Sequence, residues 1–242
     1  MTLRATLSSP DGKRRYVRRL FATVADRYDL ITRLLSYGQD SRWKARLVRL
    51  AAVTPEDRVL DLACGTGDIL FSAARRAGSA VGLDVTHRML QLAKARETAG
   101  SATHVEWVCG DMTALPFDAA RFTVITTGYG LRNVPDLGAA VAEIQRVLVP
   151  GGRLLSLDFN RPDNAVVRAA YLAYLTAVGS ALGFVLHRDP DTYRYIPESI
   201  RNYPGAHGVA RLLERHGFSD VRVIPVIGGL ITIHVARKSR GE

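Results

Sequence analysis

The ten residues 59–68, with the sequence VLDLACGTGD, place the tightest constraint on the fold of this chain. They predict an apolar strand, a glycine-rich turn and the first turn of a helix, an arrangement in which a ligand can approach backbone N–H groups closely. The turn is Gly65-Thr66-Gly67, and Asp61 stands just before it. A carboxylate at this position can meet a cation or accept hydrogen bonds from hydroxyl groups, whereas it would repel a phosphate.

Strands and helices are expected to alternate from residue 58 onward, which predicts a parallel sheet with helices on both faces. We expect strands at 58–62, 80–84, 105–109, 122–127 and 153–159, and helices at 13–37, 41–52, 68–77, 86–98, 136–149 and 207–216. Pro150-Gly151-Gly152 is expected to end the helix 136–149. Two final strands, 221–226 and 230–236, are joined by Ile227-Gly228-Gly229, which predicts an antiparallel hairpin.

The other segments are expected to be helical additions to a single α/β domain spanning residues 1–242. Residues 13–52 are predicted to form an N-terminal helical cap, and residues 161–204 an insertion over the sheet. Within the insertion, residues 169–186 carry no charge and reach the lower limit of about 18 residues for a transmembrane helix. Their Gly, Ser, Thr and Tyr residues favour a buried or interfacial helix, or the wall of an apolar pocket.

The chain is strongly basic, with 33 Lys and Arg against 23 Asp and Glu and a formal net charge of +10. Much of the excess lies early, in Lys13, Arg14, Arg15, Arg18, Arg19, Arg42, Lys44, Arg46 and Arg49. Such a surface attracts the phosphates of nucleic acid or of anionic lipid. A solvated basic helix face explains the same residues equally well.

The cysteines and the first residues suggest a cytoplasmic protein. Cys64 and Cys109 lack the spacing of a disulfide framework or a zinc site, so we expect no metal. Residues 1–10 contain no apolar core typical of a signal peptide.

Acids and glycines stand at the predicted carboxyl ends of the strands, the edge where open parallel sheets bind ligands. Asp84 ends the second strand, and an ionised carboxylate there can accept hydrogen bonds from both hydroxyls of a ribose. Asp111 and Met112 follow the third strand, where they could hold an adenine amino group and pack on its ring; a β-turn acid is the alternative for Asp111. The third glycine of the dinucleotide pattern is missing, and Asp61 with Asp68 would disfavour a pyrophosphate. S-adenosylmethionine, with its ribose, adenine and cationic end, fits better.

With these residues the chain resembles the class I S-adenosylmethionine-dependent methyltransferases, and more narrowly the ubiquinone/menaquinone biosynthesis C-methyltransferases. The matching stretches span almost the whole chain: Phe21-x3-Ala25-x2-Tyr28-Asp29, Ser36-Tyr37-Gly38 with Trp43-Lys44, residues 61–68, Gly130-Leu131-Arg132-Asn133-Val134, Pro150-Gly151-Gly152-Arg153, Tyr195-Ile196-Pro197-Glu198-Ser199-Ile200, and Gly228-Gly229 with Ile233-His234. The Gly-Leu-Arg-Asn-Val and Tyr-x-Pro-x-Ser segments are specific to the narrower family, whereas the glycine-rich turn is not.

The resemblance implies a Rossmann-like seven-stranded sheet, mostly parallel, with the last strand antiparallel. It implies S-adenosylmethionine as the cofactor and a quinol ring with an isoprenoid tail as the substrate. The residues expected at the cofactor are Tyr28, Asp61, Gly65, Thr66, Gly67, Asp84, Asp111, Met112 and Gly128.

Six positions, at four places in the chain, depart from the family's usual pattern. Tyr129 stands where Phe is usual, Gln39-Asp40 replaces a hydrophobic-His pair, Ile31-Thr32 replaces Met-Asn, and Cys64 replaces Gly. These differences concern the aromatic acceptor more than the fold or the cofactor. A methyltransferase for another phenolic or naphthoquinone small molecule is therefore the alternative.

The residues after the fourth strand are expected to act on the acceptor. Arg132 stays protonated and is an implausible base, but as a fixed cation it could stabilise a developing phenolate. Asn133 could orient the ring hydroxyl or a water, and Tyr129 could hydrogen-bond the ring oxygen. The alternative for Arg132 is a salt bridge that anchors the loop to Asp136 or Asp158.

Three further residues, Tyr195, Tyr203 and His207, are expected to line the acceptor pocket, with plain packing as the alternative for each. For a lipophilic substrate, the basic N-terminal helices could hold the protein at an anionic membrane surface, as a peripheral protein on the inner face. A homodimer is considered as well.

Two other classes of function were weighed. The net charge of +10 suggests an RNA methyltransferase. An appended RNA-binding module, a high aromatic content and a Pro-Pro-Tyr type of motif after the fourth strand are all missing, so no nucleic-acid partner is expected. A non-catalytic module that holds quinones is the other class, and the intact cofactor residues argue against it.

Overall fold

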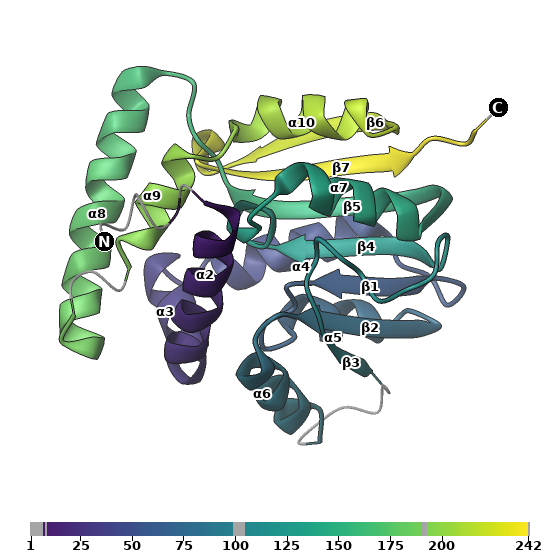
Figure 1. Ribbon diagram of the computed structural model, residues 1–242, viewed down its shortest axis with the longest axis horizontal. Helices are drawn as coiled ribbons and strands as arrows, with labels where there is room; N and C mark the ends of the chain where they lie inside the picture. Colours follow the sequence, from purple (N-terminus) through teal and green to yellow (C-terminus); the bar gives the residue numbers. More distant parts are fainter. Residues whose placement is uncertain (1–6, 8, 99–104, 190–192, 242) are drawn as a thin grey trace.

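The computed structural model describes residues 7, 9–98, 105–189 and 193–241, which build a seven-stranded sheet flanked by helices (Figure 1). The strands run in the order β3-β2-β1-β4-β5-β7-β6. They are β1 (Arg58–Leu62), β2 (Ser79–Asp84), β3 (Glu106–Cys109), β4 (Phe122–Gly128), β5 (Leu148–Phe159), β6 (Phe218–Val226) and β7 (Ile231–Lys238). β7 runs antiparallel to both of its neighbours, whereas the other pairs are parallel. The expected mostly parallel sheet with an antiparallel last strand is confirmed.

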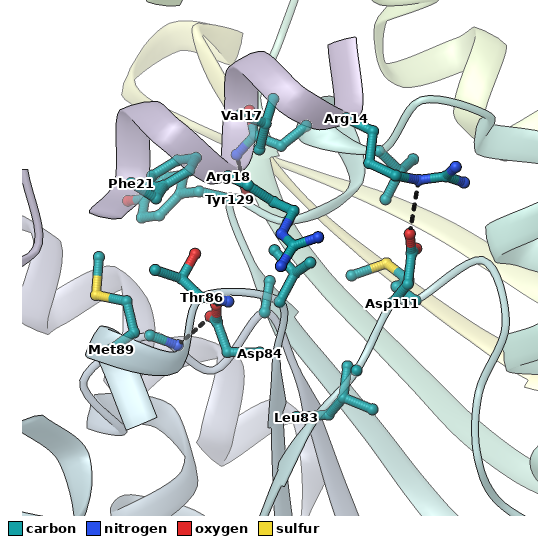
Figure 2. Close-up of a pocket in the computed structure, with 18 of the residues that line it drawn as sticks. Arg14, Val17, Arg18, Phe21, Leu83, Asp84, Thr86, Met89, Asp111 and Tyr129 are labelled. Atoms are coloured by element: carbon teal, nitrogen blue, oxygen red, sulfur yellow. Dashed lines mark hydrogen bonds and ion pairs between the residues drawn. The ribbon is translucent and has the colours of Figure 1, made fainter. Parts of the chain in front are cut away.

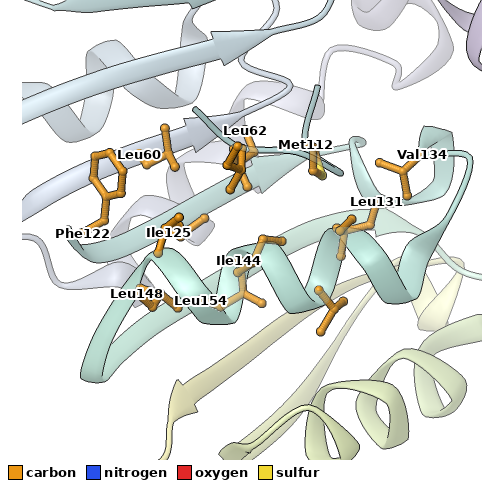
Figure 3. Packing of buried hydrophobic residues seen from close by; sticks show 14 of the residues in the cluster. Leu60, Leu62, Met112, Phe122, Ile125, Leu131, Val134, Ile144, Leu148 and Leu154 are labelled. Atoms are coloured by element: carbon orange, nitrogen blue, oxygen red, sulfur yellow. The ribbon is translucent and has the colours of Figure 1, made fainter. Parts of the chain in front are cut away.

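Helices cover both faces of the sheet because both faces of its central strands are apolar. In β1, Val59 and Leu60 are fully buried, and successive side chains point to opposite faces. Leu60 packs in a cluster with α7 (Leu137–Val147) and α10 (Gly205–Arg215), part of which is drawn in Figure 3. Val59 packs in the opposite cluster with α4 (Asp40–Ala51) and α5 (Asp68–Ala74). α6 (His87–Thr98) connects β2 to β3.

The expectation for Pro150-Gly151-Gly152 is wrong. α7 ends at Val147, and β5 already begins at Leu148, which pairs with Phe122 of β4. Leu148 is fully buried, so its burial in the sheet outweighs the helical pattern before it. The pairing register then shifts, and Gly151 takes φ +79°, so the glycines form an irregularity inside a strand and not a connection.

The N-terminal residues and the insertion lie together beyond one end of the sheet, where β1 and β4 terminate (Figure 1). The expected single helix over 13–37 is divided into α2 (Pro10–Val24), the short turn η1 (Ala25–Arg27) and α3 (Tyr28–Leu35). The insertion contains α8 (Ala165–His187) and α9 (Tyr195–Arg201). Val17 of α2 packs on Tyr195 of α9, which joins the two additions into one layer over the strand ends.

Candidate active site

Two cavities meet beyond the carboxyl ends of β1, β2 and β4. The first, here called the strand-end cleft, has a volume of about 730 Å³, and the second, the apolar cavity, about 1300 Å³, both counted with the space that is open to solvent. The cleft is lined by the strand ends and by α2, and the cavity by α2, α3, α8 and α9. Four residues line both: Phe21, Tyr28, Tyr129 and Asn133. A ligand in the cleft and a ligand in the cavity would therefore contact the same wall.

Asp84 stands at the strand-end cleft with a fixed, buried carboxylate (Figure 2). Its Oδ2 accepts a hydrogen bond from the Gly65 N–H at 2.9 Å, and its Oδ1 accepts one from the Thr86 N–H at 2.8 Å. Burial raises the pKa of Asp84, against the effect of these donors. Each carboxylate oxygen has a second lone pair, so the oriented group can also accept from a diol in the cleft.

Asp111 lies on the other side of the strand-end cleft, where an arginine from α2 reaches it (Figure 2). The Arg14 Nε donates to Asp111 Oδ2 at 3.0 Å, and Thr113 donates to Oδ1 from its backbone and its hydroxyl. Burial opposes ionisation, but these hydrogen bonds and the Arg14 charge outweigh it and lower the pKa of Asp111. Met112 and Gly128 line the cleft as well.

The glycine-rich turn contributes one residue to the cleft lining, Gly65. It has φ +55°, and a Cβ added there would meet only Tyr28 Cε1, at 3.9 Å, so it would project into the cleft. Gly67 serves packing instead: a Cβ there would lie 2.7 Å from Phe71 Cε2. The absence of a side chain at Gly65 thus keeps the cleft open, and its absence at Gly67 lets the turn pack closely against Phe71 of α5.

Asp61 and Thr66 lie behind the cleft lining and have protein partners. Asp61 is 1% exposed and accepts a hydrogen bond from Thr126 Oγ1 at 2.7 Å. Burial raises the pKa of Asp61 to about 7. The Thr66 hydroxyl donates to Asp29 Oδ1 at 2.7 Å, which ties the turn to α3. The lining of the cleft includes neither of them, nor Gly67.

The predicted acceptor residues Tyr129, Asn133 and Tyr195 come together at the apolar cavity. Asn133 donates from Nδ2 to the Tyr129 carbonyl at 2.7 Å and accepts from the Tyr195 hydroxyl at 3.0 Å. Tyr129 has φ +60°, and its hydroxyl donates to Asp40 Oδ1 at 2.7 Å. Burial, then the Asp40 charge, raise the pKa of Tyr129 well above its usual value, so the phenol stays neutral.

Arg132 lines the apolar cavity and is also held by an ion pair. Its Nε lies 3.3 Å from Asp158 Oδ1, and its backbone N–H donates to Asp158 Oδ2 at 3.1 Å. Nη1 donates to Ser199, and the guanidinium stacks over Phe159 at 5.1 Å. The anchoring alternative is therefore observed, with Asp158 and not with Asp136, which caps α7. The cation is fixed beside the cavity by the same contacts.

Two of the residues predicted to contact the acceptor line neither of the two cavities. Tyr203 follows α9 and is buried in the cluster that contains α7 and α10. The His207 side chain is 71% exposed and lies 3.9 Å from Asp163. Tyr203 precedes α10 and His207 lies within it, whereas the apolar cavity is walled by α2, α3, α8 and α9.

The sequence interpretation missed the face of α2 that lines the cleft. Arg14, Val17, Arg18 and Phe21 recur at helical spacing and all line the cleft (Figure 2). That spacing was the available signal, but it does not say what the face covers. Among the described residues, no group of three or more His, Cys, Asp or Glu could hold a metal ion.

Comparison with known proteins agrees with this geometry. Residues 10–238 match the model of the ubiE/COQ5 methyltransferase family. Demethylmenaquinone methyltransferase of Mycolicibacterium gilvum is 38% identical over 219 residues, covering 90% of this chain and 93% of that protein. The ubiquinone/menaquinone biosynthesis C-methyltransferase UbiE of Teredinibacter turnerae is 37% identical over 238 residues, covering 97% and 95%.

Solved structures share the fold at lower identity. A SAM-dependent methyltransferase of Thermotoga maritima superposes with a TM-score of 0.64 at 16% identity, covering 92% of this chain and 100% of that one. A SAM-dependent methyltransferase of Aquifex aeolicus gives 0.58 at 16% identity, covering 81% and 89%. The family model matches nearly the whole described chain, and the strand-end cleft lies beyond the carboxyl ends of the parallel strands, the edge at which open α/β sheets generally bind ligands. The protein is thus a methyltransferase, and the chain belongs to the ubiE/COQ5 methyltransferase family.

Proposed function

We propose that this protein transfers the methyl group of S-adenosylmethionine to a ring carbon of a lipophilic quinol. One observation carries the proposal: a large apolar cavity adjoins the strand-end cleft across Tyr129 and Asn133. The names of the relatives, demethylmenaquinone methyltransferase and UbiE, support a demethylmenaquinol or polyprenyl-benzoquinol acceptor. A smaller phenol or naphthoquinone that fits the same cavity is the alternative.

The residues of the cleft fit S-adenosylmethionine. Gly65 leaves open the space that a Cβ would fill, and Asp84 offers two fixed acceptor oxygens to the ribose hydroxyls. Asp111 and Met112 would hold the adenine, and Tyr28 would close the cleft beside Gly65. When bound, S-adenosylmethionine supplies a methyl group on a cationic sulfur, which needs alignment more than activation.

On the acceptor side, the protein must orient the ring and increase the electron density on its carbon. Asn133 is fixed at both ends by Tyr129 and Tyr195, so it would orient the ring at the junction of the cavities. Arg132 would stabilise the phenolate from its fixed place in the cavity wall. The lining is mostly apolar, and a less polar surrounding would strengthen the effect of the charge on the ring oxygen.

We further propose that the protein lies on the cytoplasmic face of a membrane, with α8 against the lipid. Residues 165–186 are long and apolar enough to cross a bilayer, a test that buried core helices also pass. Only 28% of the most apolar part of this helix is buried in the protein, and the side chains of Phe184 and Val185 are 64% and 73% exposed. Tyr171 and Leu175 of the opposite face pack in the protein, so α8 would lie in the interface and not cross it.

Features around α8 match an anionic lipid surface and a lipid-borne substrate. Arg188 is exposed at the end of the helix, and Arg27 is exposed while it donates to the Leu186 carbonyl. Tyr37 and Ile227 line the apolar cavity and are 74% and 50% exposed, so they stand at its mouth. A quinol could then enter the cavity from the bilayer while its tail remains in lipid.

The test is incubation with methyl-labelled S-adenosylmethionine and a reduced quinone extract from a strain that lacks its own methylase. We expect label in the quinone fraction, on a ring carbon by mass analysis. Label only in added soluble phenols or naphthoquinols would contradict the lipophilic acceptor and support the alternative. A matched reaction with the Asp84→Ala variant should give no label, because the ribose loses its acceptor.

A further inference from the structure

We propose that Tyr129 and Asp40 relay a proton from the acceptor's ring hydroxyl to solvent. The inference rests on the function proposed above. Tyr129 lines both cavities, and its hydroxyl donates to Asp40 Oδ1 at 2.7 Å. Both side chains are buried, and the two residues are 89 positions apart in sequence. A buried phenol needs a hydrogen-bond partner, and here the partner is a carboxylate able to take the proton.

A polar path leads from Asp40 away from the apolar cavity. Asp40 Oδ2 lies 2.5 Å from Lys44 Nζ, and the same ammonium lies 3.0 Å from Asp68 Oδ2. Asp40, Lys44 and Asp68 line a third, polar cavity together with Asp29. The Asp29 and Asp68 side chains are 53% and 35% exposed, so this cavity reaches the surface.

The proton balance closes with water as the final proton acceptor. The ring O–H breaks as an O–H bond forms on Tyr129, while the original Tyr129 O–H breaks as one forms on Asp40 Oδ1. Asp40 then releases its proton to water in the polar cavity, and one phenolate and one hydronium ion result. Lys44 keeps Asp68 as a partner during this step, so a protonated Asp40 does not leave the ammonium unpaired.

Burial and the neighbouring carboxylates keep the tyrosine in the neutral form that a relay needs. The titratable groups that face the pair are Lys44 of α4, Tyr28 of α3 and Asp158 of β5. Burial is the largest influence that raises the pKa of Tyr129, and the Asp40 charge adds to it. Tyr129 would touch the acceptor, whereas Asp40 acts through Tyr129 and is a positioning residue in this sense.

The experiment compares Tyr129→Phe, Asp40→Asn and the double variant with wild type, by kcat against pH and by calorimetric binding of S-adenosylmethionine. Each single variant should lower kcat about 100-fold. The double variant should lose no more than either single one, since both changes interrupt one path. The kcat of the variants should rise with pH, because hydroxide must remove the proton, whereas wild type should stay level from about pH 7 to pH 9.

Two control variants separate the relay from general damage. Asp57→Asn removes a buried carboxylate paired with Arg153 at 2.7 Å, and Tyr203→Phe removes a buried phenol hydroxyl outside both cavities. Neither should change the pH profile. If Asp40→Asn fails to fold, the pH profile of Tyr129→Phe still tests the proton relay.

Losses that multiply in the double variant, or a wild-type pH profile in Tyr129→Phe, would overturn the relay. A wild-type enzyme that methylates no quinol would instead remove the proposed function, and the relay with it.

Discussion

Asn133 and Tyr195 are joined by a hydrogen bond of 3.0 Å, which ties the loop after β4 to the first residue of α9. The same asparagine holds the Tyr129 carbonyl, so its side chain connects the insertion to the strand end. We expect Asn133→Ala to lower kcat at least tenfold, since the acceptor ring loses its orienting group. Tyr195→Phe removes the hydrogen bond from the other side and should cost about 1 kcal/mol of stability with kcat changed less than threefold. Equal losses of kcat in both variants would show that Asn133 affects turnover only through its contact with Tyr195, and not by orienting the ring itself.

Changing Arg132 together with its partner Asp158 distinguishes an anchoring role of Arg132 from a catalytic one. Arg132→Leu leaves Asp158 buried and unpaired, so the free energy of unfolding should fall by about 3–5 kcal/mol. The double variant Arg132→Leu/Asp158→Leu should recover most of that stability, as apolar replacements of buried ion pairs often do. Its kcat should nevertheless stay low, because the phenolate has lost its cation. Recovered turnover in the double variant, measured beside its denaturation curve, would assign Arg132 to anchoring alone.

Asp61 gives the folded protein a pH-dependent stability of known sign. Burial raises the pKa of Asp61 from 3.8 to about 7, so the folded chain binds more protons than the unfolded chain between those values. Stability should therefore fall as the pH rises through this window. In Asp61→Asn this slope disappears, and the variant should gain roughly 2–3 kcal/mol relative to wild type between pH 5 and pH 8. Urea denaturation at the two pH values measures the difference.

Asp57 provides the opposite case as a control for that measurement. Hydrogen bonds from Thr123 and Thr54 and the Arg153 charge outweigh burial and lower the pKa of Asp57. Its contribution is complete above the unfolded pKa and is lost only as the pH falls through the folded one. Asp57→Asn should thus be destabilised equally at pH 5 and pH 8. If the difference in free energy of unfolding between Asp57→Asn and wild type changed between pH 5 and pH 8, groups other than Asp61 would contribute to the pH dependence.

The exposed face of α8 can be tested with lipid vesicles. Wild type should sediment with vesicles that contain anionic phospholipid, and Phe184→Glu/Val185→Glu should lose most of this binding because two apolar contacts become charges. Ser219→Glu, at an exposed position on β6, adds negative charge elsewhere and should bind as wild type does. Binding that 0.5 M salt abolishes in wild type, and that the α8 variant retains, would assign the contact to the basic helices instead.

The sequence specifies the sheet better than the helical layer over it. β1 has the predicted bounds because its apolar residues are followed at once by the glycine-rich turn. The start of β5 was missed because it depends on the pairing of Leu148 with Phe122, a contact between distant residues. Asp84 and Asp111 could be placed at the ligand edge because strand ends in a parallel sheet share that edge.

Other parts of the site depend on how separate elements pack. Arg14 reaches Asp111 only because α2 lies over the strand ends, and no local pattern encodes that position. Tyr129 and Asp40 were each noticed as departures from the family pattern, but their hydrogen bond is visible only in the fold. Tyr203 and His207 look like pocket residues in sequence, yet the placement of α10 puts one in the core and the other in solvent.

The four residues that line both cavities would couple the binding of the methyl donor to the binding of the acceptor. Phe21, Tyr28, Tyr129 and Asn133 would contact both ligands, so any rearrangement that one ligand causes is felt by the other. By linkage, the factor by which the methyl donor changes the affinity for the acceptor equals the factor by which the acceptor changes the affinity for the donor. These shared residues are thus the place through which each substrate would influence the binding of the other.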